Sequence, residues 1–257
     1  MISSKEKSKQ IIKKHFPFLV FLFRKAKYPY WILRKIYKEN EKIIVYKIFG
    51  EKTDRNQWSV GNKKLMETYR QMMLWSWEET KSNSPQYFER MQYAVLKCRG
   101  RVLEIGCGIG TMTKFISMSK KVTEILAIDA FPEAIEELKT YNLPKVTALQ
   151  IPLEEIKFDN TRKFDTVILC EIIEHIFPDQ EMKMLHALKP YINAKTIYIV
   201  STPIGWLEDP HHVRGFSKRN LKRHLKRFYG EPIDIDYSAE YSQSAFGYFN
   251  KATLDTN

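Results

Sequence analysis

The sequence of 257 residues is 44% hydrophobic and 28% charged, which argues against a disordered chain and allows a sizeable buried core. Its formal net charge is +12, and residues 1–55 hold most of the excess, with 15 Lys and Arg against 5 Asp and Glu. Three widely spaced cysteines, Cys98, Cys107 and Cys170, exclude a disulfide framework and a zinc-ribbon pattern, and fit a reducing cytoplasm.

Residues 1–62 form a basic, aromatic-rich N-terminal segment. Between residues 11 and 49, apolar clusters at mostly helical spacing alternate with Lys and Arg, so we predict mainly helical structure. Such a segment can lie on an anionic membrane surface or pack as helices on the rest of the protein. The apolar run Phe16 to Phe23 is too short to span about 30 Å of hydrocarbon, and no signal-peptide cleavage site follows it. We therefore expect a cytoplasmic protein, with peripheral binding at the inner face of the membrane as an open alternative.

Residues 63–98 are predicted to be a helical lead-in to the core. The spacing of apolar residues predicts one helix over residues 63–81. Ser84 and Pro85 are typical of a helix start, so a second helix is expected over residues 86–97.

From Arg101 onwards, predicted strands alternate with helices. Five strands are expected, at residues 102–105, 124–129, 146–150, 164–171 and 196–201. Helices are expected at residues 111–118, 133–141, 180–188 and 217–228. Two late strands, at 233–237 and 245–251, are close enough in sequence to form an antiparallel hairpin at or near the sheet edge. This order predicts that residues 99–257 are one α/β domain with a mainly parallel sheet.

Three glycines, Gly106, Gly108 and Gly110, stand after a buried strand and before a helix. Glycine permits positive φ and close approach to a ligand, and the helix N-terminus directs its free N–H groups to the same place. Asp129 closes the next strand, where a carboxylate can accept hydrogen bonds from both ribose hydroxyls of a nucleoside or cap the following helix. The usual dinucleotide turn reads G-x-G-x-x-G, whereas this one reads G-x-G-x-G with Glu104 just before it. An acid there would repel a pyrophosphate and suits a cofactor with an amino group and a positive sulfonium.

With these motifs, the chain resembles the class I S-adenosylmethionine-dependent methyltransferases. Residues 102–111, 127–130 and 164–175 are similar to their first, second and fourth-strand motifs, and residues 188–190 and 199–203 match the segments that follow. The resemblance covers roughly residues 96–257. It implies a Rossmann-like seven-stranded mixed sheet with helices on both faces, and S-adenosylmethionine as the methyl donor.

The resemblance also implies which residues bind the cofactor. The glycine loop and Glu104 would hold its methionine part, Asp129 the ribose, and Cys170 would lie near the sulfonium. The complete implied set is Glu104, Gly106, Cys107, Gly108, Gly110, Asp129, Ala130, Phe131, Leu153, Glu154 and Cys170. Many relatives place an acid after the third strand, where this chain reads Gln150-Ile151-Pro152. Adenine recognition would then rest on the backbone or on Glu154.

A cluster of acids and histidines follows the fourth predicted strand, where Glu171, Glu174 and His175 form E-x-x-E-H, and His212 lies in a later loop. Two carboxylates and two imidazoles can bind Mg²⁺ or Mn²⁺. The pattern resembles the E-x-x-E-H segment and later histidine of small-RNA 2′-O-methyltransferases, which bind a metal through these groups. Ubiquinone-pathway O-methyltransferases show a similar segment. Without a metal, His175 or His212 could act as the catalytic base, and a structural or solvated role stays open for both.

The expected activity is O-methylation of a sugar or surface-glycan hydroxyl near the membrane, because a basic aromatic segment precedes a complete methyltransferase pattern. The alternatives are RNA 2′-O-methylation with a metal site, methylation of a quinol or lipid precursor, and a non-catalytic cofactor-binding scaffold. The expected partners are a small-molecule or glycan acceptor and an anionic membrane surface contacted through residues 11–49. Nucleic acid is disfavoured, since the sequence shows no separate RNA-binding module.

The helix predicted at residues 217–228 is basic. Its charged face is either solvated or a second surface that binds anions.

Overall fold

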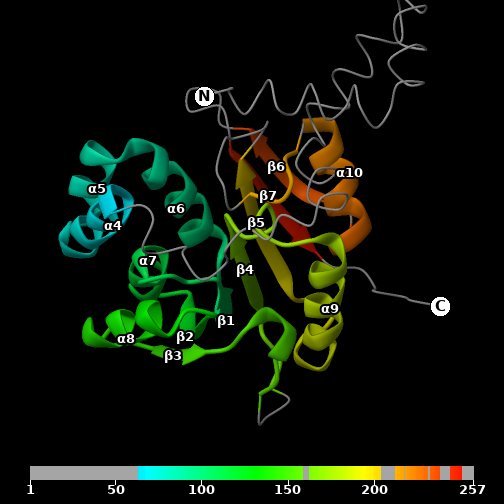
Figure 1. The fold of residues 1–257 in the computed structure, drawn as a ribbon, viewed down its shortest axis with the longest axis horizontal. Helices are drawn as coiled ribbons and strands as arrows, with labels where there is room; N and C mark the ends of the chain where they lie inside the picture. The colour runs from blue at the N-terminus through cyan, green and yellow to red at the C-terminus, as the bar shows by residue number, and fades with distance from the viewer. Residues whose placement is uncertain are drawn as a thin grey trace, which may run out of the picture.

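A mainly parallel sheet with helices on both faces forms the centre of the computed structural model (Figure 1). The structure describes residues 63–158, 162–203, 212–216, 218–230, 232–237 and 244–250. The predicted N-terminal segment, residues 1–62, and its expected membrane contact lie outside the described residues.

Five strands run parallel in the order β3-β2-β1-β4-β5. These strands are β1 (Gly100–Ile105), β2 (Val122–Asp129), β3 (Val146–Gln150), β4 (Thr166–Cys170) and β5 (Ile197–Pro203). This arrangement confirms the predicted Rossmann-like α/β fold. Beyond β5, β7 (Ser244–Asn250) and then β6 (Pro232–Tyr237) pair antiparallel with their neighbours.

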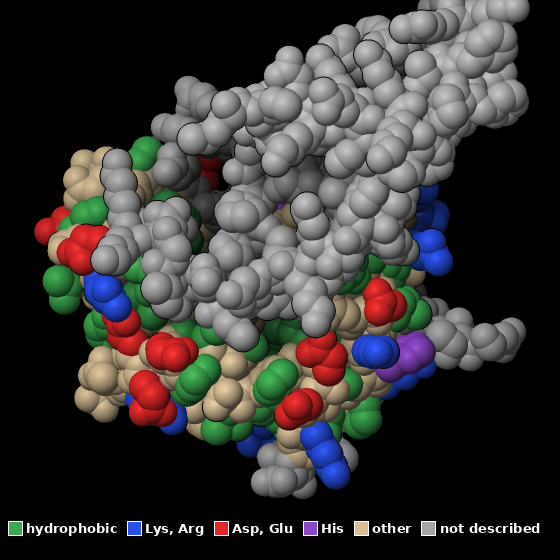
Figure 2. Space-filling model, viewed as in Figure 1, with side chains coloured by type: hydrophobic (Ala, Val, Ile, Leu, Met, Phe, Trp, Pro, Cys, Tyr) green, Lys and Arg blue, Asp and Glu red, His purple; other side chains and the backbone are tan. Residues whose placement is uncertain are grey.

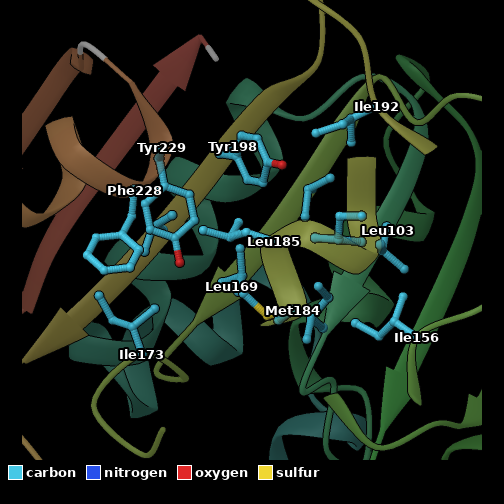
Figure 3. Packing of buried hydrophobic residues seen from close by; sticks show 14 of the residues in the cluster. Leu103, Ile156, Leu169, Ile173, Met184, Leu185, Ile192, Tyr198, Phe228 and Tyr229 are labelled. Carbon is cyan, nitrogen blue, oxygen red and sulfur yellow. The ribbon is translucent and has the colours of Figure 1, made fainter. Parts of the chain in front are cut away.

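Alternate residues of the strands serve two separate cores, one on each face of the sheet. On one face, Leu103 and Leu169 pack against α9 (Pro178–Leu188) and α10 (Lys218–Tyr229), as Figure 3 shows for Leu185, Phe228 and Tyr229. On the other face, residues such as Val102 and Ile168 pack against α6 (Pro85–Lys97), α7 (Thr111–Ser117) and α8 (Pro132–Thr140). The period of two along each strand therefore divides the strand side chains between the two cores.

The single helix predicted over residues 63–81 is wrong, because the chain forms α4 (Lys63–Leu74) and α5 (Trp77–Asn83) instead. Ser76 starts α5 with a capping box: its hydroxyl accepts from Glu79 N at 3.2 Å, and Glu79 Oε2 accepts from Ser76 N at 2.7 Å. The end of α4 is bound by buried Lys114 of α7, whose Nζ donates to the carbonyls of Met72, Met73 and Trp75. These contacts satisfy the groups that a continuous helix would have used.

A second difference concerns β5, which was predicted to end at Ser201 and continues to Pro203. Its last residues, Thr202 and Pro203, pair with β7. The extension matters because the carboxyl ends of β1, β2, β4 and β5 share one edge of the sheet, and Thr202 lies there.

A search of the described helices finds none with the length and hydropathy that a membrane span requires.

Candidate active site

The glycine loop between β1 and α7 turns through three left-handed residues. Gly106, Gly108 and Gly110 have φ of +72°, +53° and +93°. A Cβ on Gly106 would lie 2.0 Å from Ile172 Cδ1, and one on Gly110 would lie 2.3 Å from Leu138 Cδ1. The left-handed backbone is what favours glycine at both positions, because the atoms that a Cβ would meet are the ends of flexible side chains that can shift.

Asp129, at the end of β2, lies directly against this loop. Its Oδ2 accepts from Gly108 N at 2.8 Å, and its Oδ1 accepts from Phe131 N at 3.0 Å. Burial raises the pKa of Asp129 above its ordinary value, although these backbone hydrogen bonds oppose the shift. The carboxylate thus joins the glycine loop to the start of α8, where the sequence placed the ribose.

Glu104 is a carboxylate buried beneath the loop, with only 4% of its surface exposed. Among the described residues, none donates a hydrogen bond to its Oε2. Burial raises the pKa of Glu104 to about 7; the neighbouring Thr113 hydroxyl opposes the shift, and the negative charge of Asp129 adds to it. A buried acceptor without a donor is costly. The α-ammonium group of a methionine moiety is a donor of the required charge, so the residues present fit S-adenosylmethionine.

The other residues implied for the cofactor are distributed around the same edge. Cys107 is buried within the loop, Cys170 is half-buried at the end of β4, and Phe131 packs near Ile109. Ala130 is exposed, and its carbonyl accepts from Gln150 Nε2 at 3.4 Å.

The predicted adenine-side residues, Leu153 and Glu154, form the short helix η2 (Leu153–Glu155). The Glu154 carboxylate is exposed and accepts from Gln180 Nε2 of α9 at 2.6 Å. This hydrogen bond orients Glu154 toward α9.

The two acids after β4 are each held by a hydroxyl from the end of β5. Glu171 has a left-handed backbone, with φ of +57°, and its Oε1 accepts from Ser201 Oγ at 3.0 Å. Glu174 is 2% exposed, and its Oε2 accepts from Thr202 Oγ1 at 2.9 Å. Glu171 thus leaves β4 in a left-handed conformation, and both acids contact hydroxyls at the end of β5.

Glu174, His175 and His212 come together as one group, whose potential ligand atoms all lie within 4.8 Å of one another. Glu174 Oε1 lies 3.9 Å from His175 Nε2, and the His175 and His212 rings meet edge to face with centroids 4.7 Å apart. The predicted metal set also included Glu171, which lies outside this group and is bound by Ser201. One carboxylate and two imidazoles can bind a divalent cation or, without one, accept a proton.

Sequence reasoning missed the residues that hold Glu171 and those that hold the group of Glu174, His175 and His212. Ser201 and Thr202 could have been noticed as polar residues ending an apolar strand. Glu181 could have been noticed because it lies three, four and seven residues before Met184, Leu185 and Leu188 on the buried face of α9. Its partner Arg214 carries no comparable signal, because the contact joins residues 33 positions apart.

Comparison with protein families agrees with this geometry. Residues 103–194 match the family model described as "Methyltransferase domain". The ubiquinone biosynthesis O-methyltransferase of Rickettsia bellii (strain OSU 85-389) is 36% identical over 104 residues, which cover 39% of this chain and 41% of the relative. That of Vibrio vulnificus (strain YJ016) is 30% identical over 97 residues, covering 35% and 40%. The chain thus spans about two fifths of the length of these curated relatives.

Solved structures show the same fold. The structure described as "DhpI-SAM-HEP complex" has a TM-score of 0.51 at 18% identity, covering 72% of this chain and 94% of that one. The N-methyltransferase NodS from Bradyrhizobium japonicum WM9 has a TM-score of 0.52 at 14% identity, covering 66% and 98%.

Proposed function

We propose that the chain is a class I S-adenosylmethionine-dependent methyltransferase that transfers the methyl group to a hydroxyl oxygen, and the match of residues 103–194 to the family model supports this. The observation that carries the proposal is one sheet edge with a vacant acceptor on Glu104 and a histidine pair beside Glu174. The first feature suits a cationic donor, and the second suits a nucleophile that must lose a proton.

The proposed reaction forms one bond and breaks one. The hydroxyl oxygen attacks the methyl carbon in line with the sulfonium, the C–S bond breaks, and S-adenosylhomocysteine leaves as a neutral thioether. The hydroxyl proton passes to the imidazole of His175 or His212. Glu174 is buried beside His175 and stabilises the imidazolium that results.

As an alternative for the same group, we propose that Glu174, His175 and His212 bind a divalent cation, in which case the two imidazoles are ligands and do not accept the hydroxyl proton. Two imidazoles beside one carboxylate suit a first-row transition metal better than Mg²⁺, and Mn²⁺ is the transition metal of the two ions predicted from the sequence. Such a cation would lower the pKa of the acceptor hydroxyl. Glu171, which is held by Ser201, would then lie outside the set of metal ligands.

For the acceptor, two classes have a specific observation in their favour. The curated relatives are named ubiquinone biosynthesis O-methyltransferases, which supports a quinol or lipid precursor. The basic aromatic residues 11–49 support an acceptor at an anionic membrane surface, either that precursor or a surface-glycan hydroxyl. Peripheral attachment at the inner face of the membrane, through a mainly helical segment, is part of this proposal.

The test is methyl transfer from labelled S-adenosylmethionine to three acceptors: a catechol-type quinol precursor, a membrane glycan extract and a short RNA. The expected result is labelling of the quinol or the glycan, with loss of at least tenfold in kcat for His175→Gln and unchanged affinity for S-adenosylhomocysteine. Methyl transfer measured after chelation, and again after Mn²⁺ is added back, tests whether the reaction uses a metal. Labelling of RNA alone would replace the acceptor proposal, and full activity of His175→Gln would remove the proton-transfer role.

A further inference from the structure

A buried polar cluster lies behind the histidine pair and reaches neither the glycine loop nor Asp129. Glu181 of α9 is fully buried, and its carboxylate accepts three hydrogen bonds. The donors are Arg214 Nη2 at 2.6 Å, His224 Nε2 at 3.0 Å and Tyr229 Oη at 2.6 Å. Arg214 is 3% exposed and Tyr229 is fully buried, so water does not screen the cluster.

Glu181 stays ionised in this surrounding. Burial alone would raise its pKa, but the His224 hydrogen bond and the positive charge of Arg214 together hold the pKa below its ordinary value. A buried ion pair of this kind adds little net stability compared with apolar packing, but separating its members would leave a buried charge without a partner, which holds them in contact. The cluster is therefore better suited to fixing a geometry than to stabilising the fold.

Three separate parts of the chain meet at this carboxylate. Glu181 belongs to α9, His224 and Tyr229 belong to α10, and Arg214 belongs to the short segment after β5. Figure 3 shows Tyr229 approaching the α9 residues from α10. The Arg214 side chain is thereby held between two helices that are themselves packed on the sheet.

The same arginine is also bound to the turn that carries the acids. Arg214 Nε donates to the Ile173 carbonyl at 2.5 Å. The backbone N–H groups of Val213 and Arg214 both donate to the Glu174 carbonyl, at 2.9 and 3.3 Å. Residues 213 and 214 therefore fasten the chain next to His212 onto the turn that carries Glu174 and His175.

We propose that Arg214 and Glu181 are positioning residues that hold the His212 imidazole against His175 and Glu174. The pair sets the geometry of the proton-accepting or metal-binding group and leaves the cofactor loop untouched. This inference rests on the proposed function for its effect on catalysis, whereas its structural part, the placement of His212, stands without it.

The test compares Arg214→Met with Arg214→Lys and Glu181→Gln in the full chain. Arg223→Met is the matched control, because Arg223 is an exposed arginine on α10. Long-range ¹H–¹⁵N spectra of ¹⁵N-histidine-labelled protein report the His212 and His175 rings, and His212→Gln assigns the signal. Calorimetry with S-adenosylhomocysteine reports the cofactor site.

In Arg214→Met, we expect the His212 ring signals to shift and broaden, with S-adenosylhomocysteine affinity within twofold of the parent protein. We expect kcat to fall on the order of 10²-fold with KM for the methyl donor unchanged, because small displacements of catalytic groups cost that much. Arg214→Lys, which keeps the charge, should recover part of both changes, and Arg223→Met should match the parent. Should Arg214→Met not fold, Glu181→Gln gives the same readouts with an almost isosteric change.

Unchanged His212 signals in a folded Arg214→Met or Glu181→Gln protein would overturn the inference. Equal loss of S-adenosylhomocysteine binding and of His212 order would also overturn it, since that pattern indicates general destabilisation. Failure of the parent protein to bind S-adenosylhomocysteine would instead count against the proposed function, and the His212 spectra would still decide the positioning role.

Discussion

At the residue scale, Glu104 is the group whose chemistry most restricts the kind of ligand that the site can bind. Its carboxyl group is buried with a pKa of about 7, so in the protein without ligand it holds a proton below about pH 7 and loses it above. A bound ammonium group would stabilise the ionised form and lower that pKa. Binding and deprotonation are therefore linked.

This linkage predicts a pH dependence. Affinity for S-adenosylhomocysteine should rise as pH increases toward about 7 and level off above it, because below that pH the carboxyl must first lose its proton. Glu104→Gln should bind more weakly and lose this dependence. Calorimetry between pH 5.5 and 8.5 checks both; a parallel pH profile in the variant would show that Glu104 is not the linked group.

In the protein without ligand, Glu104 makes the folded state less stable as pH rises, whereas it makes ligand binding stronger. Its folded-state pKa is raised above the ordinary 4.5, so its contribution to stability is lost as pH rises from about 4.5 through about 7. At pH 8, without ligand, Glu104→Gln should therefore be more stable by about 1–3 kcal/mol. Urea unfolding at pH 4.5 and pH 8 measures the difference, and a variant less stable than the parent at pH 8 would contradict it.

Site residues whose place follows from the order of strands and helices along the chain could be predicted from the sequence. Site residues that are placed by contacts between distant parts of the chain could not. The glycines and Asp129 stand at fixed places relative to β1, α7 and β2, so their position followed from the succession of elements. Thr202 holds Glu174 from 28 residues away, and such a contact depends on which strands become neighbours. Only the folded sheet brings β4 and β5 side by side.

At the element scale, the division between α4 and α5 shows how a local signal competes with periodicity. The apolar spacing continues from Leu65 to Trp77, but Ser76 and Glu79 stand at the spacing of a capping box. Tertiary contact then decides the outcome, because Lys114 of α7 binds the carbonyls at the end of α4. The capping pattern was present in the sequence, whereas the lysine contact was not visible there.

Lys114 should accordingly be important for the lead-in helices. Lys114→Met would leave the α4 carbonyls of Met72 and Met73 without their donor, at a cost of about 2–3 kcal/mol. Lys120→Met, at an exposed position after the same helix, is the control and should change stability by less than about 0.5 kcal/mol. Denaturant unfolding measures both, and equal stability of the two variants would contradict the role given to Lys114.

At the scale of the whole molecule, positive charge is concentrated in two places. One is residues 1–55 of the sequence, and the other is α10, whose exposed face carries Arg219, Lys222, Arg223, Lys226 and Arg227. The opposite face of α10 buries Leu221, Leu225 and Phe228 in the core. Lys and Arg side chains are visible at this edge of the molecule in Figure 2. Both regions suit an anionic surface.

Vesicle sedimentation tests this partner. The full chain should bind anionic vesicles and lose binding with added salt, because electrostatic attraction to the headgroups is screened. A chain beginning at Gly61 keeps α4 and the sheet, and should bind much more weakly. Equal sedimentation of the two chains would remove residues 11–49 as the membrane contact.

The central claim is that the edge of the sheet at Glu104, the glycine loop and Asp129 binds S-adenosylmethionine. Calorimetric titration of the full chain with S-adenosylhomocysteine tests it most directly. The account predicts one binding site per chain, with affinity reduced at least tenfold in Asp129→Ala and unchanged in Asp179→Ala, an exposed acid on α9. Absence of binding in the parent chain, or equal affinity in both variants, would contradict the account.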